Sequence, residues 1–490
     1  MRVVFRVDAS TAIGSGHVMR CLALAESLRA RGSDVGFVCR QQAGDLTGLI
    51  TARGFDVHVL SAPGIQDADE TLQCLVEPVD WMVVDHYGLG LPWEERIRSR
   101  AEQVLVMDDL AQQRHDCDIL VDPMYPGDAE RYNGLVPPSA ALLLGPRYAQ
   151  MDEAYAVHAH RPAIHHTPDR LLVFFGGSDL PDLTGRTLRA VTGSALGVLP
   201  VEVVVGQTNP HVRRLAELVS RRPGTTIHGP QPSLAALMST CTVAAGAGGV
   251  TLWERMCMGL AGIVVSLADN QVPSCRALDE AGYVTYLGTS DDVTEAHLSA
   301  GIHGVLADPE GARNQAELGQ ALVDGLGALR VGETMQPTPT SGLVLRNARP
   351  ADRGLLFGWA NDPDVRRHSF SPEAITWAAH CAWFSNRLSE PRTRMFVMEA
   401  AGLPVGQARF DLDDSGAVLD YSVDEAFRGR GWGAALLSLA CARLRSETAL
   451  PIRAETQRDN AASIHALEHA GFRIHADADV RAGAVLLVLE

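Results

Sequence analysis

A glycine-rich turn with a histidine, Gly14-Ser15-Gly16-His17, stands near the start of the chain, between an apolar stretch and an amphipathic segment. Glycine lets the backbone turn tightly beside a ligand, and the free N–H groups of a helix N-terminus attract anions. An imidazole at this place can take a proton from water near neutral pH. The pattern predicts that His17 is a general base beside a ligand held by Gly14 and Gly16. Capping of the helix by His17 is the simpler alternative.

Polar residues follow two later apolar stretches. Asp85-His86-Tyr87-Gly88 comes after Trp81–Val84, and Asp108-Asp109 comes after Val104–Met107. The carboxyl ends of the strands in open α/β sheets meet at one edge, where ligands bind. We therefore expect these groups to converge at that edge, although helix capping or a surface ion pair explains the two aspartates better.

Two further turns predict a nucleoside diphosphate site. The backbone amides of Gly177 and Ser178, and those of Gly248 and Gly249, are placed to bind a pyrophosphate, as is the hydroxyl of Thr251. Glu254 lies one helical turn further on, where a carboxylate can accept hydrogen bonds from both ribose hydroxyls. Asn270 follows the next strand, at the same edge of the sheet. Taken alone, Glu254 would be an ordinary solvated helix residue.

The C-terminal part carries a different motif, Arg428-Gly429-Arg430-Gly431-Trp432-Gly433-Ala434, between the strand Gly416–Val423 and the helix Ala435–Glu447. Consecutive amides at a helix N-terminus, with two arginines beside them, fit the pyrophosphate of coenzyme A. The amide near Val423, at the strand end, could polarise a thioester carbonyl. Asn460 opens the next helix.

Apolar strands and helical segments alternate over the first two thirds of the chain, which indicates doubly wound parallel sheets. The strands are predicted at Val3–Val7, Val35–Cys39, Val57–Leu60, Trp81–Val84, Val104–Met107, Ile119–Val121, Leu171–Phe175, Val201–Val205, Thr225–His228, Val243–Ala245 and Ile263–Val265, and helices at His17–Arg31 and Trp93–Glu102. A Pro- and His-rich hinge over His158–Pro168 and a Pro/Thr-rich segment divide the pattern. The predicted parts are a Rossmann-like domain over 1–165, a second over 168–331, a linker over 332–342 and an α/β domain over 343–490.

Composition narrows the choice of partners. The 490 residues carry a net charge of −17, which argues against a nucleic-acid or anionic-membrane surface. Nine cysteines without a CxxC pair show no metal-ligand spacing and fit reduced thiols. Because the start lacks an apolar signal core and no apolar stretch is long enough to span a bilayer, we expect a soluble cytoplasmic protein. The cysteine spacing also leads us to expect no metal.

The motifs of residues 1–330 together resemble a known family. Gly-x-Gly-His-x-x-Arg, Asp-His-Tyr-Gly and Asp-Asp-Leu-Ala are similar to the UDP-sugar hydrolases of pseudaminic acid biosynthesis. The resemblance implies a metal-free glycosyltransferase-B-like fold that releases UDP from UDP-2,4-diacetamido-2,4,6-trideoxy-β-L-altropyranose. It makes His17 the base and Tyr87 a residue of the sugar site. The order Gly-Gly-Ser, Gly-Gly-x-Thr-x-x-Glu, Asn-Gln also resembles the UDP-binding half of the lipid II-forming N-acetylglucosaminyltransferase, with Glu254 on the ribose and Asn270 near the sugar and phosphates.

Residues 343–490 resemble the GNAT acetyltransferases, which implies acetyl-CoA as co-substrate. Many of these enzymes carry a Tyr or His proton donor where this chain has Leu467; His465 and His469 are nearby, in a core or surface role. In pseudaminic acid synthesis, acetylation of the 4-amine of a UDP-sugar precedes UDP release, so the resemblances imply a bifunctional enzyme of consecutive steps. The alternatives are a UDP-sugar-dependent glycosyltransferase with an attached acetyltransferase, or with a domain that only senses coenzyme A.

Overall fold

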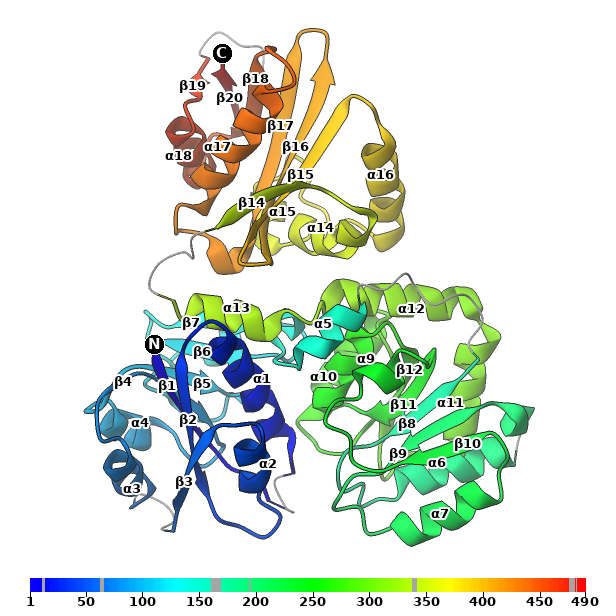
Figure 1. Ribbon diagram of the computed structural model, residues 1–490. Coiled ribbons are helices and arrows are strands. Elements are labelled where there is room, and N and C mark those ends of the chain that lie inside the picture. Colours follow the sequence, from blue (N-terminus) through cyan, green and yellow to red (C-terminus); the bar gives the residue numbers. More distant parts are fainter. Residues whose placement is uncertain are drawn as a thin grey trace. The chain divides into compact units, whose positions relative to one another are not determined.

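The computed structural model describes residues 1–10, 14–61, 66–159, 169–193, 195–336, 342–475, 481 and 483–490. The chain divides into two compact units, Met1–Gly332 and Glu333–Glu490. Figure 1 shows two parallel α/β halves in the first unit and a mixed sheet flanked by helices in the second. This α/β architecture is the one that the sequence predicts.

The first half of unit 1 is built on seven parallel strands in the order β3-β2-β1-β4-β5-β6-β7. The strands are β1 (Arg2–Val7), β2 (Asp34–Arg40), β3 (Asp56–Leu60), β4 (Val79–Asp85), β5 (Ala101–Met107), β6 (Ile119–Asp122) and β7 (Ala141–Leu144). The helices are α1 (Gly16–Ala30), α2 (Thr47–Ala52), α3 (Gln66–Cys74), α4 (Leu91–Ile97) and α5 (Glu153–Ala159), with short 3-10 helices at Ala129–Tyr132 and Pro146–Tyr148. Central strands rich in Val, Leu and Met are buried because helices cover both faces of the sheet.

The second half of unit 1 holds six parallel strands in the order β10-β9-β8-β11-β12-β13. They are β8 (Leu171–Phe174), β9 (Val201–Val204), β10 (Thr225–His228), β11 (Val243–Ala247), β12 (Ala261–Ser266) and β13 (Thr285–Thr289). The helices are α6 (Leu183–Thr192), α7 (Val212–Ser220), α8 (Ala235–Met238), α9 (Val250–Cys257), α10 (Gln271–Glu280), α11 (Glu295–Ala307), α12 (Pro309–Leu322) and α13 (Gly327–Thr334), with a 3-10 helix at Ala195–Val198.

Helix α13 returns to the first half of the unit. A Cβ placed on Gly332 would lie 3.4 Å from Leu28 Cδ2 of α1, and the Arg330 guanidinium donates to the Arg147 carbonyl at 2.9 Å. The end of the second half is therefore held against the first, and the two halves form one unit.

Two of the predicted boundaries differ from the structure. The helix expected over Trp93–Glu102 ends at Ile97, because Ala101–Met107 pairs with β4 as strand β5. Helix α13 continues to Thr334, so the first three residues of the predicted linker are helical. Residues 160–168 of the predicted hinge and 337–341 of the linker lie outside the described residues.

Unit 2 has a seven-stranded sheet in the order β14-β15-β16-β17-β18-β20-β19. The strands are β14 (Leu343–Asn347), β15 (Thr393–Ala400), β16 (Leu403–Asp413), β17 (Gly416–Val423), β18 (Ile452–Gln457), β19 (Arg473–Ile474) and β20 (Ala484–Leu489). The helices are α14 (Arg353–Ala360), α15 (Pro363–Arg367), α16 (Trp377–Ser389), α17 (Trp432–Arg445) and α18 (Ala461–His469), with 3-10 helices at Pro350–Asp352 and Glu425–Phe427. Strands β17 and β18 are parallel neighbours in an otherwise antiparallel sheet.

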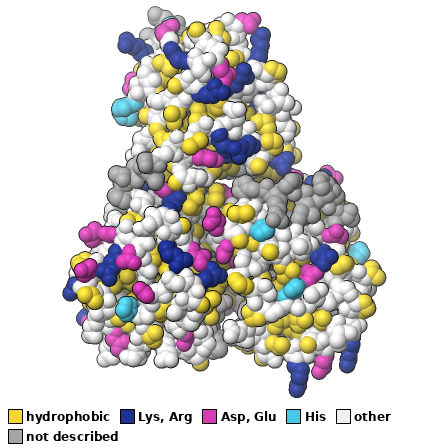
Figure 2. Space-filling model, in the orientation of Figure 1, with side chains coloured by type: hydrophobic (Ala, Val, Ile, Leu, Met, Phe, Trp, Pro, Cys, Tyr) yellow, Lys and Arg dark blue, Asp and Glu magenta, His cyan; other side chains and the backbone are white. Residues whose placement is uncertain are grey.

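Basic and acidic side chains lie interspersed on the face drawn in Figure 2. Within the described ranges, no helix combines the length and the apolar character that crossing a bilayer requires.

Candidate functional site

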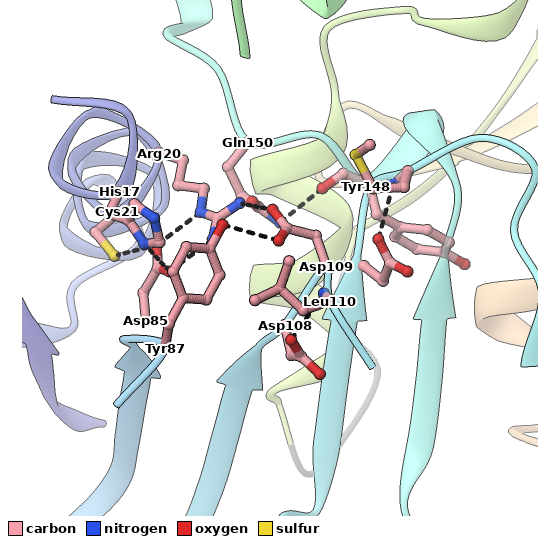
Figure 3. Close-up of polar contacts among 12 residues, drawn as sticks. His17, Arg20, Cys21, Asp85, Tyr87, Asp108, Asp109, Leu110, Tyr148 and Gln150 are labelled. Carbon is pink, nitrogen blue, oxygen red and sulfur yellow. Dashed lines mark hydrogen bonds and ion pairs between the residues drawn. The ribbon is translucent and has the colours of Figure 1, made fainter. Parts of the chain in front are cut away.

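His17 lies at the start of α1, where it meets the carboxyl end of β4. Its Nδ1 is 2.6 Å from Oδ1 of Asp85, the last residue of β4, and the side chain is only 11% exposed (Figure 3). A carboxylate beside Nδ1 favours the tautomer that carries its proton there and leaves the Nε2 lone pair free. The pair can therefore present Nε2 as a base, in the manner of a His–Asp dyad.

Arg20, one turn further along α1, holds Asp85 in place. Its Nε and Nη2 each lie 2.6 Å from an Asp85 oxygen, and its Nη1 lies 3.2 Å from Asp109 Oδ2. Burial disfavours the Asp85 charge, but Arg20 and His17 outweigh that penalty and hold the pKa of Asp85 well below its usual range. Asp85 thus stays ionised beneath His17.

Tyr87 completes this group, which we call the His17 cluster: His17, Arg20, Asp85, Tyr87 and Asp109. The Tyr87 hydroxyl donates to Asp109 Oδ1 at 2.9 Å, and its ring meets the His17 ring edge-on at 4.7 Å. Tyr87 is 42% exposed, and partial burial beside Asp109 raises the pKa of its phenol. The cluster presents one imidazole and one phenol at the sheet edge (Figure 3).

The two aspartates of the Asp108-Asp109 pair have different roles. Asp108 accepts from the amides of Leu110 and Ala111 at 2.9 and 3.1 Å and closes a local turn; no helix lies in the fully described stretch between β5 and β6, so the expected helix capping is wrong. Asp109 instead joins the His17 cluster, and the preference for capping or a surface ion pair missed it. The i,i+3 spacing of His17 and Arg20 on one helix face indicates a carboxylate shared by these two residues, which is Asp85, but it does not indicate Asp109.

A second buried network supports the strand ends. Asp8, just after β1, binds the Arg6 guanidinium at 2.6 and 3.0 Å and lies 3.3 Å from His86 Nε2. The His86 Nδ1 accepts from the Gly88 amide at 3.0 Å, so both ring nitrogens are engaged. His86 therefore fixes the loop that carries Tyr87.

His115 is a separate buried histidine, with Nδ1 2.6 Å from Glu94 Oε1. Its two carboxylate neighbours, Glu94 and Asp108, raise its pKa to about 9 against the opposing effect of burial.

In the second half, β11 leads into the turn Gly248-Gly249 and helix α9, which carries Thr251 and Glu254. A Cβ on Gly248 would lie 2.4 Å from Cys275 Sγ, so no larger residue fits. Buried Arg255 donates to the Ala247 carbonyl at 2.5 Å and braces the turn; burial lowers its pKa to about 10. This bracing was not predicted, because an arginine in a helix ordinarily points to solvent.

Glu254 faces a cavity between the two halves. Its Oε2 is shielded from solvent and has no hydrogen-bond partner within the described part of the chain. Burial raises the pKa of this carboxyl to about 7, against the opposing effects of Tyr155 and Arg255. A buried carboxylate oxygen without a donor is costly, so Oε2 is suited to accept a hydrogen bond from a ligand. The cavity is lined by Met19, Arg20, Leu22, Ala23, Glu26, Arg53, Gln150, Met151, Asp152, Tyr155, Pro232, Ser233, Val250 and Glu254.

Arg20 links this cavity to the His17 cluster, since it lines the one and belongs to the other. The turn before α1 also approaches the second half: a Cβ on Gly16 would lie 3.4 Å from Val250 Cγ2, and one on Gly177 would lie 3.8 Å from Ser15 Oγ. The structure thus brings the turns of Gly16, Gly177 and Gly249 together. Two other predicted binding residues are chain neighbours of these contacts. Gly14 lies directly before Ser15, and the half-buried Ser178 lies directly after Gly177. Asn270 is exposed before α10 and is not a lining residue of the cavity.

In unit 2 the glycine turn, residues Gly429 to Gly433, lies at its predicted place, after β17 and at the start of α17. Gly429 and Gly431 have φ of +74° and +80°, a region that favours glycine, and both are exposed. Gly433 and Ala434 form the first turn of α17. Arg430 is exposed and has no ion-pair partner within the described ranges. The turn can offer its amides, and Arg430 its charge, to a pyrophosphate.

Arg428 and Asn460 have structural partners instead. Arg428 donates from Nε to the Val423 carbonyl at 3.0 Å, and its Nη2 lies 2.9 Å from Asp362 Oδ1. Asn460 Oδ1 accepts from the Ser463 amide at 3.1 Å and caps α18. Leu467 is buried on α18. His465 and His469 are exposed neighbours whose rings are 4.2 Å apart, which fits a surface role.

Comparisons with known proteins agree with this division. Residues 342–473 match the acetyltransferase (GNAT) domain family. A UDP-2,4-diacetamido-2,4,6-trideoxy-beta-L-altropyranose hydrolase of Campylobacter jejuni is 26% identical over 240 residues, which are 49% of this chain and 82% of the hydrolase. An uncharacterised protein of Methanocaldococcus jannaschii is 22% identical over 496 residues, covering 96% of this chain and 97% of its own. Among solved structures, MurG of Acinetobacter baumannii covers 68% of this chain and 99% of its own, with a TM-score of 0.49 and 16% identity.

The chain is therefore homologous to a UDP-sugar hydrolase along 49% of its own length, and it carries a GNAT acetyltransferase domain in its C-terminal part.

Proposed function

We propose that the chain is a bifunctional enzyme of nonulosonic acid biosynthesis. Unit 1 hydrolyses UDP-2,4-diacetamido-2,4,6-trideoxy-β-L-altropyranose to the free sugar and UDP. Unit 2 transfers an acetyl group from acetyl-CoA to the 4-amine of the UDP-sugar precursor. The hydrolase homologue and the acetyltransferase domain support the two reaction classes.

The observation that carries the hydrolase proposal is the His17–Asp85 pair beside the cavity of Glu254. His17 Nε2 takes a proton from water, whose oxygen attacks the anomeric carbon. The bond from that carbon to the β-phosphate oxygen breaks, and UDP leaves with the electron pair. Arg20 keeps Asp85 charged beneath the imidazolium that forms.

The second half would hold the leaving group. Amides from Gly249 to Thr251, at the positive end of α9, donate hydrogen bonds to the phosphate as its charge develops, whereas the Gly248 amide already donates to the Val265 carbonyl at 3.3 Å. Glu254 Oε2 accepts hydrogen bonds from the ribose hydroxyls, which satisfies its unpaired oxygen. The reaction needs no covalent intermediate, since UDP is already a good leaving group and the protein has only to position one water.

For unit 2, we assign the pyrophosphate of acetyl-CoA to the turn Gly429–Gly433 and to Arg430. We assign the acetyl carbonyl to the strand-end amide near Val423, which would polarise it. Arg428 positions the end of β17 through the Val423 carbonyl and is not assigned to the pyrophosphate. Acetylation requires a neutral amine, which attacks the carbonyl carbon of the bound thioester.

The test is to incubate the full chain with the diacetamido UDP-sugar in ¹⁸O-labelled water and no acceptor. The proposal expects equal amounts of UDP and free sugar, with the label on the sugar. UDP release that needs a sugar or lipid acceptor would identify a glycosyltransferase instead. Acetyl-CoA binding without transfer to a 4-amino UDP-sugar would leave unit 2 as a coenzyme A sensor.

A further inference from the structure

Strands β17 and β18 diverge beside the glycine turn of unit 2. Strand β17 pairs with β18 only at Ala417–Leu419, and the segment from Asp420 to Val423 stays paired with β16 alone. A Cβ on Gly433 would lie 3.7 Å from Val423 Cγ2, 4.0 Å from Tyr421 Cε2 and 3.5 Å from Ala466 Cβ. Tyr421 and Val423 therefore lie where the strands part, beside the first turn of α17 and helix α18, and we call this place the β17–β18 fork.

The Tyr421 hydroxyl is held against helix α18 by Ser463. It lies 3.0 Å from Ser463 Oγ, one turn before Leu467 on α18. Burial raises the pKa of Tyr421, so the phenol keeps its proton at neutral pH. Tyr421 thus offers a proton close to the helix position where Leu467 has none.

The composition of unit 2 leaves few other donors. All 42 basic residues of the chain are arginines, and Tyr421 is the only tyrosine after Tyr286. Arginine keeps its proton, and Cys441 is buried in α17 with its pKa raised to about 12 by burial.

The remaining histidines and the other cysteine lie elsewhere. His380 packs among Trp377, Trp383 and Phe384, and its Nε2 donates to the Arg353 carbonyl at 2.9 Å. Cys381 is on α16, His368 follows α15, His475 follows β19, and His465 and His469 are on the exposed side of α18. Tyr421 is the proton donor that the described residues bring to the β17–β18 fork.

We propose that Tyr421, oriented by Ser463, protonates the thiolate that leaves when the acetyl group is transferred; this rests on the acetyltransferase activity proposed for unit 2. The amine forms a bond with the acetyl carbon, the carbon–sulfur bond breaks, and the electron pair stays on sulfur. Sulfur takes the phenol proton. The amine releases one proton to solvent, and the phenolate regains one, so the products are the amide and coenzyme A.

Three variants of the full chain test the assignment. Tyr421→Phe removes the proton and keeps the ring, so kcat for acetyl transfer should fall about 10- to 100-fold while KM for acetyl-CoA changes less than about threefold. Ser463→Ala should lower kcat less. Leu467→Tyr in the Tyr421→Phe background places a phenol on α18, one turn after Ser463, and should recover part of kcat, with Leu467→Tyr alone as its control.

A second readout does not depend on turnover. The difference between the ultraviolet pH titrations of the wild type and Tyr421→Phe isolates the Tyr421 phenol, and added coenzyme A should shift this difference titration. No shift with bound coenzyme A, or an unchanged kcat in Tyr421→Phe, would overturn the inference. A wild type that acetylates no 4-amino UDP-sugar would instead overturn the proposed function of unit 2.

Discussion

The two sites of this chain use different means to organise polar chemistry. The His17 cluster is dense in full charges, with the Asp85 carboxylate bound by Arg20 and by His17 at 2.6 Å. The β17–β18 fork of unit 2 instead gathers the phenol of Tyr421, a serine hydroxyl and glycine backbone. Release of UDP needs an activated water and a fixed base, whereas a thioester is already activated and needs a polarised carbonyl and one proton. The first site should therefore be sensitive to lost charge and the second to changes of backbone.

The largest expected effect is at the base itself. His17→Ala should lower kcat for UDP release by about 10²- to 10⁴-fold, because no other described group of the cluster can replace Nε2. Acetyl transfer by the same protein should stay at the wild-type rate. Measuring both products from one reaction checks this, and exposed His465→Ala is the control that should alter neither. Undiminished UDP release by His17→Ala would remove the assignment of the base.

The two aspartates that share Arg20 offer a matched pair. Asp85→Asn removes the acceptor of His17 Nδ1 and favours the wrong tautomer, so UDP release should fall about 100-fold. Asp109→Asn also touches Arg20 but not His17, and should cost only about tenfold through Tyr87. Steady-state kinetics, with circular dichroism to verify folding, would measure both. Equal losses in the two variants would mean that the His17–Asp85 contact contributes no more to UDP release than the Arg20–Asp109 contact does.

Glu254 gives the nucleotide cavity a pH dependence of known sign. Its pKa of about 7 in the free protein leaves the carboxyl largely protonated at lower pH. Ribose hydroxyls donate to the charged form, so binding below pH 7 releases a proton and UDP affinity should fall about tenfold per pH unit. Titration calorimetry from pH 5 to 8 measures this slope. In Glu254→Gln only the titration of UDP itself should remain, and an identical slope in both proteins would exclude Glu254 from the ribose.

The smallest effects should come from the exposed glycines of unit 2. Gly431→Ala and Gly402→Ala both place a side chain at φ near +80° with no neighbouring atom within 4 Å, and each should cost about 1 kcal/mol of stability. Only Gly431 lies in the turn before α17, so only Gly431→Ala should raise KM for acetyl-CoA, by a few-fold. Thermal unfolding and initial rates would separate the two. A raised KM in Gly402→Ala as well would assign the change to strain.

The sequence predicted the fold well where strands are apolar on both faces. The expected strands of both parallel sheets occur within a few residues of their predicted bounds, because buried runs such as Trp81–Val84 and Ile263–Val265 leave no other element possible. Strands β7 and β13 were missed. The burial of β13 is only partial along its whole length, so its apolar signal is weak.

The candidate sites were predictable from motifs, but the partners of their side chains were not. His17 and Glu254 stand where the glycine turns place them. Asp109 joins Arg20 and Tyr87 across strands β4 and β5, and Arg428 turns toward Asp362, far away in the sequence. Such pairings depend on tertiary geometry, which residue spacing along the chain does not encode.

The order of the two reactions is the most direct test of the account. A time course by NMR would follow the full chain with a 4-amino UDP-sugar, first without and then with acetyl-CoA. The account expects little UDP until acetyl-CoA is added, then the acetylated nucleotide, and after it UDP and free diacetamido sugar. UDP released at the same rate before and after acetyl-CoA is added would contradict it.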